Sequence, residues 1–328
     1  MEKQSLIKKF YSDDFKITAK GKWYAIAPLA IIMIGVLVIA IWNFNLGLDF
    51  TGGRIINVRG FSDYSAAETQ VRQILSAEDG MNMRAVQIQE EISLTHGSTM
   101  SVRFQDISGA DMDVVSARIA DAIRNSNHAA LAGAIVEPAT TITGATSQDR
   151  IMNTIYAVVI ALFGILVYML FRFKLTSGIS TVIGLIHDVL VMMALTAIFQ
   201  IQINAPFIAA LITVIAYSIN NTLILFDRVR THEKHNEGRL PIEQIVDKSV
   251  KETFARTMNT TITTLVPIFV LIVAGVPLIR EFAIPIMFGL IAGTFSTIFV
   301  TTSLYVRFEK HQARRRKGLA TKTSTSKT

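Results

Sequence analysis

The sequence predicts a polytopic α-helical membrane protein that carries one folded α/β domain on the far side of the membrane. Three observations lead to this fold class. Half of the 328 residues are apolar, only 17% are charged, and the mean hydropathy is +0.43, which is unusual for a soluble domain. The apolar residues gather into six long runs, and a stretch of mixed composition, 43–148, separates the first run from the second.

The six apolar runs have the length that a membrane span needs. The first run, 23–42, contains no charged residue, and a helix of this length reaches about 30 Å, the thickness of the hydrocarbon layer. Because the run exceeds the apolar core of a cleaved signal peptide, we expect a retained anchor. The other predicted spans are 151–171, 178–199, 205–226, 260–276 and 283–306.

The distribution of charge predicts the orientation of these spans. The N-terminal segment 1–22 carries six lysines and the tail 307–328 is strongly basic, whereas residues 50–148 contain seven arginines, eleven acidic residues and no lysine. Since Lys and Arg are enriched on the cytoplasmic side, we expect both termini and the loop 227–256 in the cytoplasm. The tail has too few apolar residues to predict a fold. The net charge of +7 thus reflects topology and contact with membrane lipid, and it implies no nucleic-acid partner.

The mixed stretch 43–148 predicts one folded domain with linkers. Strand-like alternation and helix-like spacing give the order β-α-β-β-α-β, which is the ferredoxin-like arrangement of an α+β domain. The last residues before the second span, 140–147, are rich in Thr and Gly and predict a linker. The expected elements are strand 54–59, helix 64–77 with Ser65 as its N-cap, strand 84–89, strand 100–104, helix 110–123 and strand 132–136.

The sequence offers no catalytic residue, no metal site and no cofactor site. It contains no cysteine, which excludes disulfides and thiolate ligands. The histidines of the folded domain, His96 and His128, stand alone, without a nucleophile or a second ligand. The chain also lacks the phosphate-binding pattern G-x-x-x-x-G-K-[ST]. We therefore expect a domain that binds or braces another molecule, in a protein that is not an enzyme.

Polar residues inside the predicted spans need a reason, because a charged group at the centre of a bilayer costs about 2.5–3.5 kcal/mol on insertion scales. The candidates are Asp188 in the third span, Asn220 and Asn221 in the fourth, and Arg256 at the start of the fifth. Asn, Ser and Thr side chains often do no more than join helices by hydrogen bonds, so a structural role remains the alternative for Asn220, as for Ser218 and the nearby threonines. A buried carboxylate is harder to explain in this way.

Two further groups have simple structural explanations. Asp227 and Arg228, at the end of the fourth span, fit a position at the membrane surface, where charge costs little. The segment 43–53 follows the first span directly, and Gly52 and Gly53 permit positive φ angles. Physical chemistry alone therefore predicts a tight turn that leaves the membrane at this point.

These motifs together resemble the SecD/SecF family of bacterial protein-export membrane subunits, a branch of the resistance-nodulation-division superfamily. The fragments Tyr168-x-x-x-Arg172-Phe173, His187-Asp188 and Arg256-Thr257 are similar to family patterns, as is Tyr217–Asn220 followed by Phe226–Arg230. Six spans with a single external domain of this size are typical of the SecF members. The segment LGLDFTGG is similar to the signature that opens the family's external domain, with Gly47, Asp49, Phe50, Thr51, Gly52 and Gly53.

The resemblance implies an accessory subunit of the Sec protein translocase in the bacterial cell membrane. In this family the chain pairs with a SecD-like subunit, and the pair attaches to the SecYEG channel, in some species with YajC and YidC. The implied client is unfolded preprotein, whose translocation and release on the external side are promoted by a proton or sodium gradient. Apart from that coupling ion, the resemblance implies no cofactor.

One departure from the family pattern affects the coupling hypothesis. Asn221 stands where the family usually has an aspartate that acts with the fifth-span arginine, and Arg256 is retained. Because asparagine cannot ionise, three alternatives follow. Asp188 or a carboxylate of the SecD-like chain takes over, neutral oxygens bind a cation such as sodium, or this chain does not couple to ions. The hypothesis is that Asp188, Asn220, Asn221 and Arg256 form the ion-coupling site.

The main alternative function is half of a resistance-nodulation-division-type exporter of a small molecule or a lipid. That function predicts a large external domain and a substrate pocket between two halves, and the stretch 43–148 is short for such a domain. A multispan enzyme is a third alternative, but no catalytic dyad or pair of metal ligands occurs at membrane depth. A neighbouring gene for a SecD-like chain would favour protein export.

Overall fold

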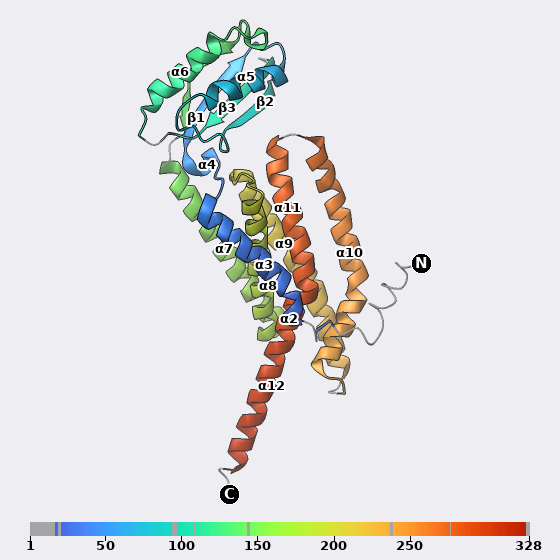
Figure 1. Cartoon of the computed structure of the whole chain (residues 1–328). Coiled ribbons are helices and arrows are strands. Elements are labelled where there is room, and N and C mark those ends of the chain that lie inside the picture. The colour runs from blue at the N-terminus through green and yellow to red at the C-terminus, as the bar shows by residue number, and fades with distance from the viewer. Residues whose placement is uncertain are drawn as a thin grey trace. The chain divides into compact units, whose positions relative to one another are not determined.

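A computed structural model describes residues 17–18, 21–93, 97–107, 109–142, 145–236, 239–275 and 277–325 (Figure 1). The chain divides into two compact units. We call the first the helical unit; it comprises residues 1–43, 157–199 and 209–328. The second comprises 44–156 and 200–208 and contains the β-sheet, so we call it the α/β unit.

The α/β unit contains one antiparallel sheet and two main helices. The sheet has the strand order β2-β3-β1-β4, and β5 pairs with β1. The central strand β1 places Ile56 opposite Val102 and Val58 opposite Met100 of β3. The elements are α4 (Leu48–Thr51), β1 (Gly53–Arg59), α5 (Tyr64–Ser76), β2 (Gln87–Ser93), β3 (Gly97–Phe104), α6 (Met112–Arg124), the 3-10 turn η2 (Ala129–Leu131), β4 (Ile135–Val136) and β5 (Thr140–Ile142).

The core of the α/β unit lies between the sheet and helices α5 and α6. Val71 and Leu75 of α5, with Ile119 and Ile123 of α6, pack against buried residues of β1 and β3. Both helices begin at an aspartate. Asp63 caps α5 and accepts a hydrogen bond from the Ala66 amide at 3.2 Å, and Asp111 caps α6 in the same way. The predicted N-cap, Ser65, was wrong, because Ser65 lies inside the first turn.

Three expected elements of this unit have different bounds in the structure. Strand β2 begins three residues later than the expected strand 84–89. The expected strand 132–136 is reduced to β4, because the 3-10 turn η2 precedes it. The linker expected at 140–147 was wrong in part, since 140–142 form β5 and helix α7 begins at residue 145. Pairing with β1 explains β5, which joins Ile142 to Gly53.

The helical unit is built from long apolar helices. Five helical stretches among the described residues have the length and composition to cross a membrane, and α3 is a sixth, shorter apolar helix. Helices α8, α9 and α11 are the most buried, whereas few residues are buried in the apolar stretches of α7 and α10. The elements are α2 (Gly21–Tyr24), α3 (Ile26–Trp42), α7 (Ala145–Arg172), α8 (Leu175–Ile198), α9 (Ala205–Asn236), α10 (Ile242–Ala274), α11 (Pro277–Phe295), the π-helical segment η3 (Ser296–Thr301) and α12 (Thr302–Thr325).

Two segments outside the predicted spans are helical. Helix α9 continues to residue 236 and α10 begins at 242, so the expected loop 227–256 is mostly two helix ends. Their buried residues Val229, Ile245 and Val250 share an apolar cluster with Tyr305, which explains the extension. The basic tail is also helical as far as residue 325. Its Lys, Arg and Ala residues are strong helix formers, so composition outweighed the lack of a core.

Glycines allow the central helices to approach closely, as is common among helices in membranes. A Cβ atom on Gly35 of α3 would lie 2.6 Å from the Ala194 Cα of α8. A Cβ atom on Gly289 of α11 would lie 2.6 Å from a Val214 methyl of α9. Both distances are shorter than any ordinary carbon contact, so these positions exclude larger residues.

Candidate functional site

A buried carboxylate lies where α8, α9 and α11 meet. Asp188 of α8 is only 1% exposed. Its Oδ2 atom accepts a hydrogen bond from the Ser218 hydroxyl of α9 at 2.5 Å, and its Oδ1 atom lies 3.0 Å from Nδ1 of His187. A Cβ atom on Gly293 of α11 would lie 3.4 Å from Oδ2, so this glycine lets α11 close the site. The sequence places these groups on three separate helices.

Two buried polar atoms on α8 and α9, the helices that hold this carboxylate and its donor, have no hydrogen-bond partner among the described residues. They are Nδ2 of Asn221, whose side chain is 1% exposed, and Nε2 of His187. Asn221 lies three residues after Ser218 and therefore on the same side of α9. A buried polar group without a partner costs about 1–3 kcal/mol. Packing of this chain alone does not explain such a cost, so we regard Asp188, His187, Ser218 and Asn221 as the candidate site.

A π-helical segment borders the site. The segment η3 follows α11 and contributes Thr297, whose hydroxyl lies 3.1 Å from that of Thr222 on α9. Thr301 of η3 packs so closely on Gly184 of α8 that a Cβ atom on the glycine would overlap its hydroxyl. π-helical turns inside α-helices occur frequently at functional sites. Here the segment brings threonine hydroxyls against both helices that carry the buried carboxylate and its donor.

Arg256 belongs to a different part of the helical unit. Its side chain is exposed and lines a hollow of about 530 Å³ together with residues of α7 and α9. No hydrogen bond or ion pair joins Arg256 to Asp188 or Asn221 in the part of the chain that the structure describes. Arg256 is thus exposed and Asp188 is buried, with no direct bond between the two groups that the sequence hypothesis placed together.

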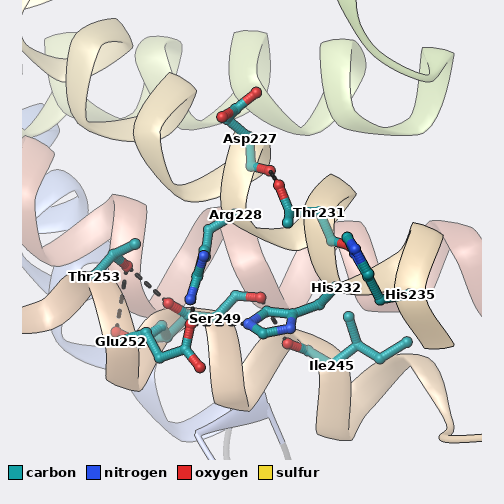
Figure 2. A network of polar contacts seen from close by, with 10 residues as sticks. Asp227, Arg228, Thr231, His232, His235, Ile245, Ser249, Glu252 and Thr253 are labelled. Atoms are coloured by element: carbon teal, nitrogen blue, oxygen red, sulfur yellow. Dashed lines mark hydrogen bonds and ion pairs between the residues drawn. The ribbon is translucent and has the colours of Figure 1, made fainter.

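Ion pairs surround this hollow and join the ends of α7, α9 and α10. Arg172 lies 3.3 Å from Asp227, and Arg228 forms an ion pair with Glu252. Nε2 of His232 also lies 2.8 Å from Glu252, so this carboxylate joins two side chains of α9 (Figure 2). Asp227 and Arg228 thus join α9 to α7 and α10, and their position at the membrane surface stays a prediction.

Asn220 does not point into the buried site. It is exposed on α9, as Arg256 is on α10. The same two helices are joined by the Tyr217 hydroxyl, which donates to Thr261 Oγ1 at 3.0 Å. Thr261 is in turn 2.9 Å from the Thr294 hydroxyl of α11. The four residues of the sequence hypothesis therefore fall into two sets. Asp188 and Asn221 are buried, whereas Asn220 and Arg256 are exposed on α9 and α10.

The signature segment lies in the α/β unit. Gly47 precedes the one-turn helix α4, which contains Asp49, and Gly53 begins β1. Gly52 and Gly53 have φ angles of 73° and 148°, as a tight turn requires. Phe50 is buried, and the Thr51 hydroxyl donates to the Gly47 carbonyl at 3.2 Å. These residues form no part of the buried carboxylate site.

Sequence reasoning missed the part that α11 plays in the site. Gly289 and Gly293 follow the spacing G-x-x-x-G, which is a known signal for close helix packing in membranes. That signal could have pointed to α11 as the helix that closes against the polar residues of α8 and α9. Spacing alone does not show which polar residues of α8 and α9 lie against these glycines.

Comparison with known proteins gives a consistent result. The family described as "Protein export membrane protein SecD/SecF, C-terminal" matches residues 124–311. The protein translocase subunit SecF of Sebaldella termitidis is 28% identical over 93% of this chain and 96% of the relative. The SecF of Helicobacter pylori strain 26695 is 30% identical over 84% of this chain and 80% of the relative.

Solved structures agree with these relatives. A crystal structure of SecDF from Thermus thermophilus, described as a translocon-associated membrane protein, has a TM-score of 0.69 and 28% identity. The likeness covers 90% of this chain but only 39% of that one. A SecDF structure in a super-membrane-facing form has the same TM-score, at 26% identity. This chain thus spans most of the SecF relatives and about two fifths of the SecDF proteins.

Proposed function

This chain belongs to the SecD/SecF family of protein export membrane proteins, and from that premise we propose that it is an accessory subunit of the Sec protein translocase. Together with a SecD-like subunit, it promotes the translocation of unfolded preproteins and their release on the external side of the membrane. The observation that carries this proposal is the match over 96% of a SecF relative. It acts through conformational change and is not an enzyme.

We infer the membrane topology from the charge pattern and the helices together. Helix α3 is 17 residues long and directly follows α2, so it provides a sixth span in addition to the five longer ones. Both termini then lie in the cytoplasm of a bacterial cell, and the α/β unit lies outside. Its order β1-α5-β2-β3-α6-β4 and its sheet order support a ferredoxin-like domain.

The exposed polar face of α9 and α10 supports a membrane-embedded partner. Asn220 and Arg256 are exposed in the isolated chain, and Arg256 has no ion-pair partner among the described residues. Exposure of such groups to lipid is costly. We therefore propose that this face contacts the SecD-like subunit and that the subunit supplies an acidic or polar partner for Arg256. Attachment to SecYEG, with YajC or YidC, extends the same proposal to the wider assembly.

We propose that Asp188 is the ionisable group that couples this chain to an ion gradient, with the proton as the ion. Asn221 cannot ionise, whereas Asp188 is buried on α8 with Ser218 as donor. Protonation of the carboxylate would change its hydrogen bonds with α9 and thereby alter the packing of the two helices. This choice selects one of the three alternatives that the sequence leaves open.

The first test is secretion of a reporter with a signal peptide in cells that are depleted of this chain. Rescue by the wild-type chain, measured as processing and release over minutes, would support the export role. No delay on depletion, with SecYEG intact, would refute it and favour the exporter of small molecules or lipids.

The coupling hypothesis is then tested in the same cells with Asp188→Asn. This variant keeps a hydrogen-bond acceptor for Ser218 but cannot ionise, so we expect export that no longer responds to a protonophore. Asp227→Asn is the matched control, since Asp227 pairs with Arg172 outside the buried site and should retain the response. Sodium-free medium distinguishes the two ions. Unchanged sensitivity of Asp188→Asn to the protonophore would reject Asp188 as the coupling group.

A further inference from the structure

The signature segment holds the connection between α8 and α9. The Ile203 amide donates to the Asn45 carbonyl at 2.8 Å, and the Gly47 amide donates to the Ile203 carbonyl at 2.7 Å. These bonds form a parallel bridge in which Leu46 lies opposite Ile203. The Asn45 side chain adds a bond to the Gln200 carbonyl at 3.0 Å. All these residues belong to the α/β unit.

Asp49 completes this arrangement at the start of α9. Its Oδ2 atom accepts a hydrogen bond from the Ala205 amide, the first residue of that helix, at 2.9 Å. A carboxylate here satisfies an otherwise unpaired amide and also interacts favourably with the positive end of the helix dipole. An aspartate that lies 156 residues away in sequence therefore caps the first amide of α9, beside Asn204, whose Oδ1 accepts a hydrogen bond from the Phe207 amide at 3.3 Å.

The same segment is fastened to the sheet. The Gln105 side chain, just after β3, donates to the Leu46 carbonyl at 2.7 Å, and the side chains of Gln87 on β2 and Gln202 form a hydrogen bond. Ile203 and Gln202 are 8% and 6% exposed. The connection between α8 and α9 is thus buried against the α/β unit and bonded to it.

The glycines of the signature are explained by this close packing. A Cβ atom on Gly47 would lie 3.2 Å from both Asn204 Cβ and the Ile203 carbonyl oxygen. A Cβ atom on Gly53 would lie 2.5 Å from a Leu48 methyl and would overlap the Phe104 carbonyl. The first glycine therefore admits the connection between α8 and α9, and the second admits the end of β3.

We infer that Asn45–Asp49 and Gln200–Ala205 form a permanent clamp, with Asp49 as a positioning residue for α9. The clamp makes the first turn of α9 part of the α/β unit, while the same helix carries Ser218 and Asn221 further along. The clamp therefore fixes the position of the first turn of α9 within the α/β unit. The clamp itself is independent of the export proposal, but its effect on export rests on that proposal.

The clamp can be tested in the full chain by disulfide cross-linking in membranes. The natural chain has no cysteine, so Leu46→Cys with Ile203→Cys provides the only two thiols. The bridge places these residues directly opposite each other, as a disulfide requires. We expect rapid cross-linking of the pair, no cross-linking of either single variant, and full reporter export by the cross-linked chain, because the clamp stays closed.

Asp49→Ala in this background tests the positioning residue. We expect cross-linking to slow about fivefold, the factor that corresponds to loss of a typical N-cap, and export to fall. Asp63→Ala is the matched control, because it removes an aspartate N-cap from α5 in the same unit without touching the clamp. It should leave the cross-linking rate unchanged. Asp49→Asn, which retains an acceptor, should lie between wild type and Asp49→Ala.

Two results would overturn the inference. One is equal cross-linking and export for Asp49→Ala and Asp63→Ala, which would show that Asp49 does not hold α9. The other is a cross-linked chain that loses export and regains it on reduction, which would show that the clamp has to open. If the wild-type chain itself gives no rescue of export, the proposed function fails, and the cross-linking rates alone then decide the clamp.

Discussion

Replacing Gly53 with alanine should loosen the α/β unit much more than the same change at Gly133. Gly53 begins β1 with a φ angle of 148°, a region that residues with a side chain rarely adopt. The added Cβ atom would lie 2.5 Å from a Leu48 methyl and 3.1 Å from the Gln105 Cα. It would also overlap the Phe104 carbonyl, which belongs to the β1–β3 ladder. Relief therefore requires a backbone shift in the sheet.

The magnitude follows from two costs. A strained backbone conformation costs about 1–3 kcal/mol, and overpacking of a filled site costs a further ~1–3 kcal/mol. The sum, about 2–6 kcal/mol, is a large part of the 5–15 kcal/mol that stabilises a typical domain. Gly133 also has a positive φ angle, 81°, but a Cβ atom there would meet nothing within 4 Å. We expect only the backbone cost at Gly133, about 1–2 kcal/mol.

Hydrogen exchange of the amides in β1 and β3 measures this difference in the full chain. Since 1.4 kcal/mol corresponds to a factor of about ten, Gly53→Ala should speed exchange by at least about 30-fold where local opening controls the rate. Gly133→Ala should speed it by about 5- to 30-fold. Equal rates for the two variants would show that the packing around Gly53 yields without cost, and the steric argument would be rejected.

Three further predictions concern other contacts. Gly289→Ala should lower the thermal midpoint of the purified chain, because overpacking against Val214 costs about 1–3 kcal/mol, and Val214→Ala should restore most of it. Tyr217→Phe should cost about 0.6 kcal/mol in unfolding by denaturing detergent, typical of a hydrogen bond between membrane helices, with little effect when Thr261→Val has already removed the acceptor. Burial, reinforced by nearby acidic groups, raises the pKa of Tyr64 to about 12. The stabilising effect of the protonated Tyr64 hydroxyl is therefore complete below pH 10 and lost as the pH rises through 12. Tyr64→Phe should remove one tyrosinate from the absorbance titration, and it should reduce unfolding at alkaline pH.

The sequence was a good guide wherever a property depends on neighbouring residues. Long apolar runs predicted the helices that can cross a membrane, because partition into lipid depends on local composition and length. The alternating pattern predicted β1 and β3, and helical spacing predicted α5 and α6. Predictions were weaker at ends, as for the loop 227–256 and the tail, where packing and helix propensity extended the helices beyond the apolar residues.

The candidate site could be predicted only in part. Polarity in an apolar context was enough to select Asp188 and Asn221, since burial of either side chain is costly whatever the fold. The separation of Arg256 from both could not be predicted, because it depends on the direction in which α10 presents each side chain. The exposed position of Asn220, next to the buried Asn221, has the same cause, since successive residues on a helix point about 100° apart.

By itself the sequence determined the membrane-spanning character, the position of the folded domain in the chain and the family to which the protein belongs. Tertiary structure alone decided which distant residues meet. Ser218 reaches Asp188 from the next helix, and Gly293 admits α11 beside them. Asp49 caps a helix that begins at Ala205. The physical reason is that composition and periodicity act over a few residues, whereas these contacts arise when helices and strands from distant segments pack closely enough to exclude solvent and lipid.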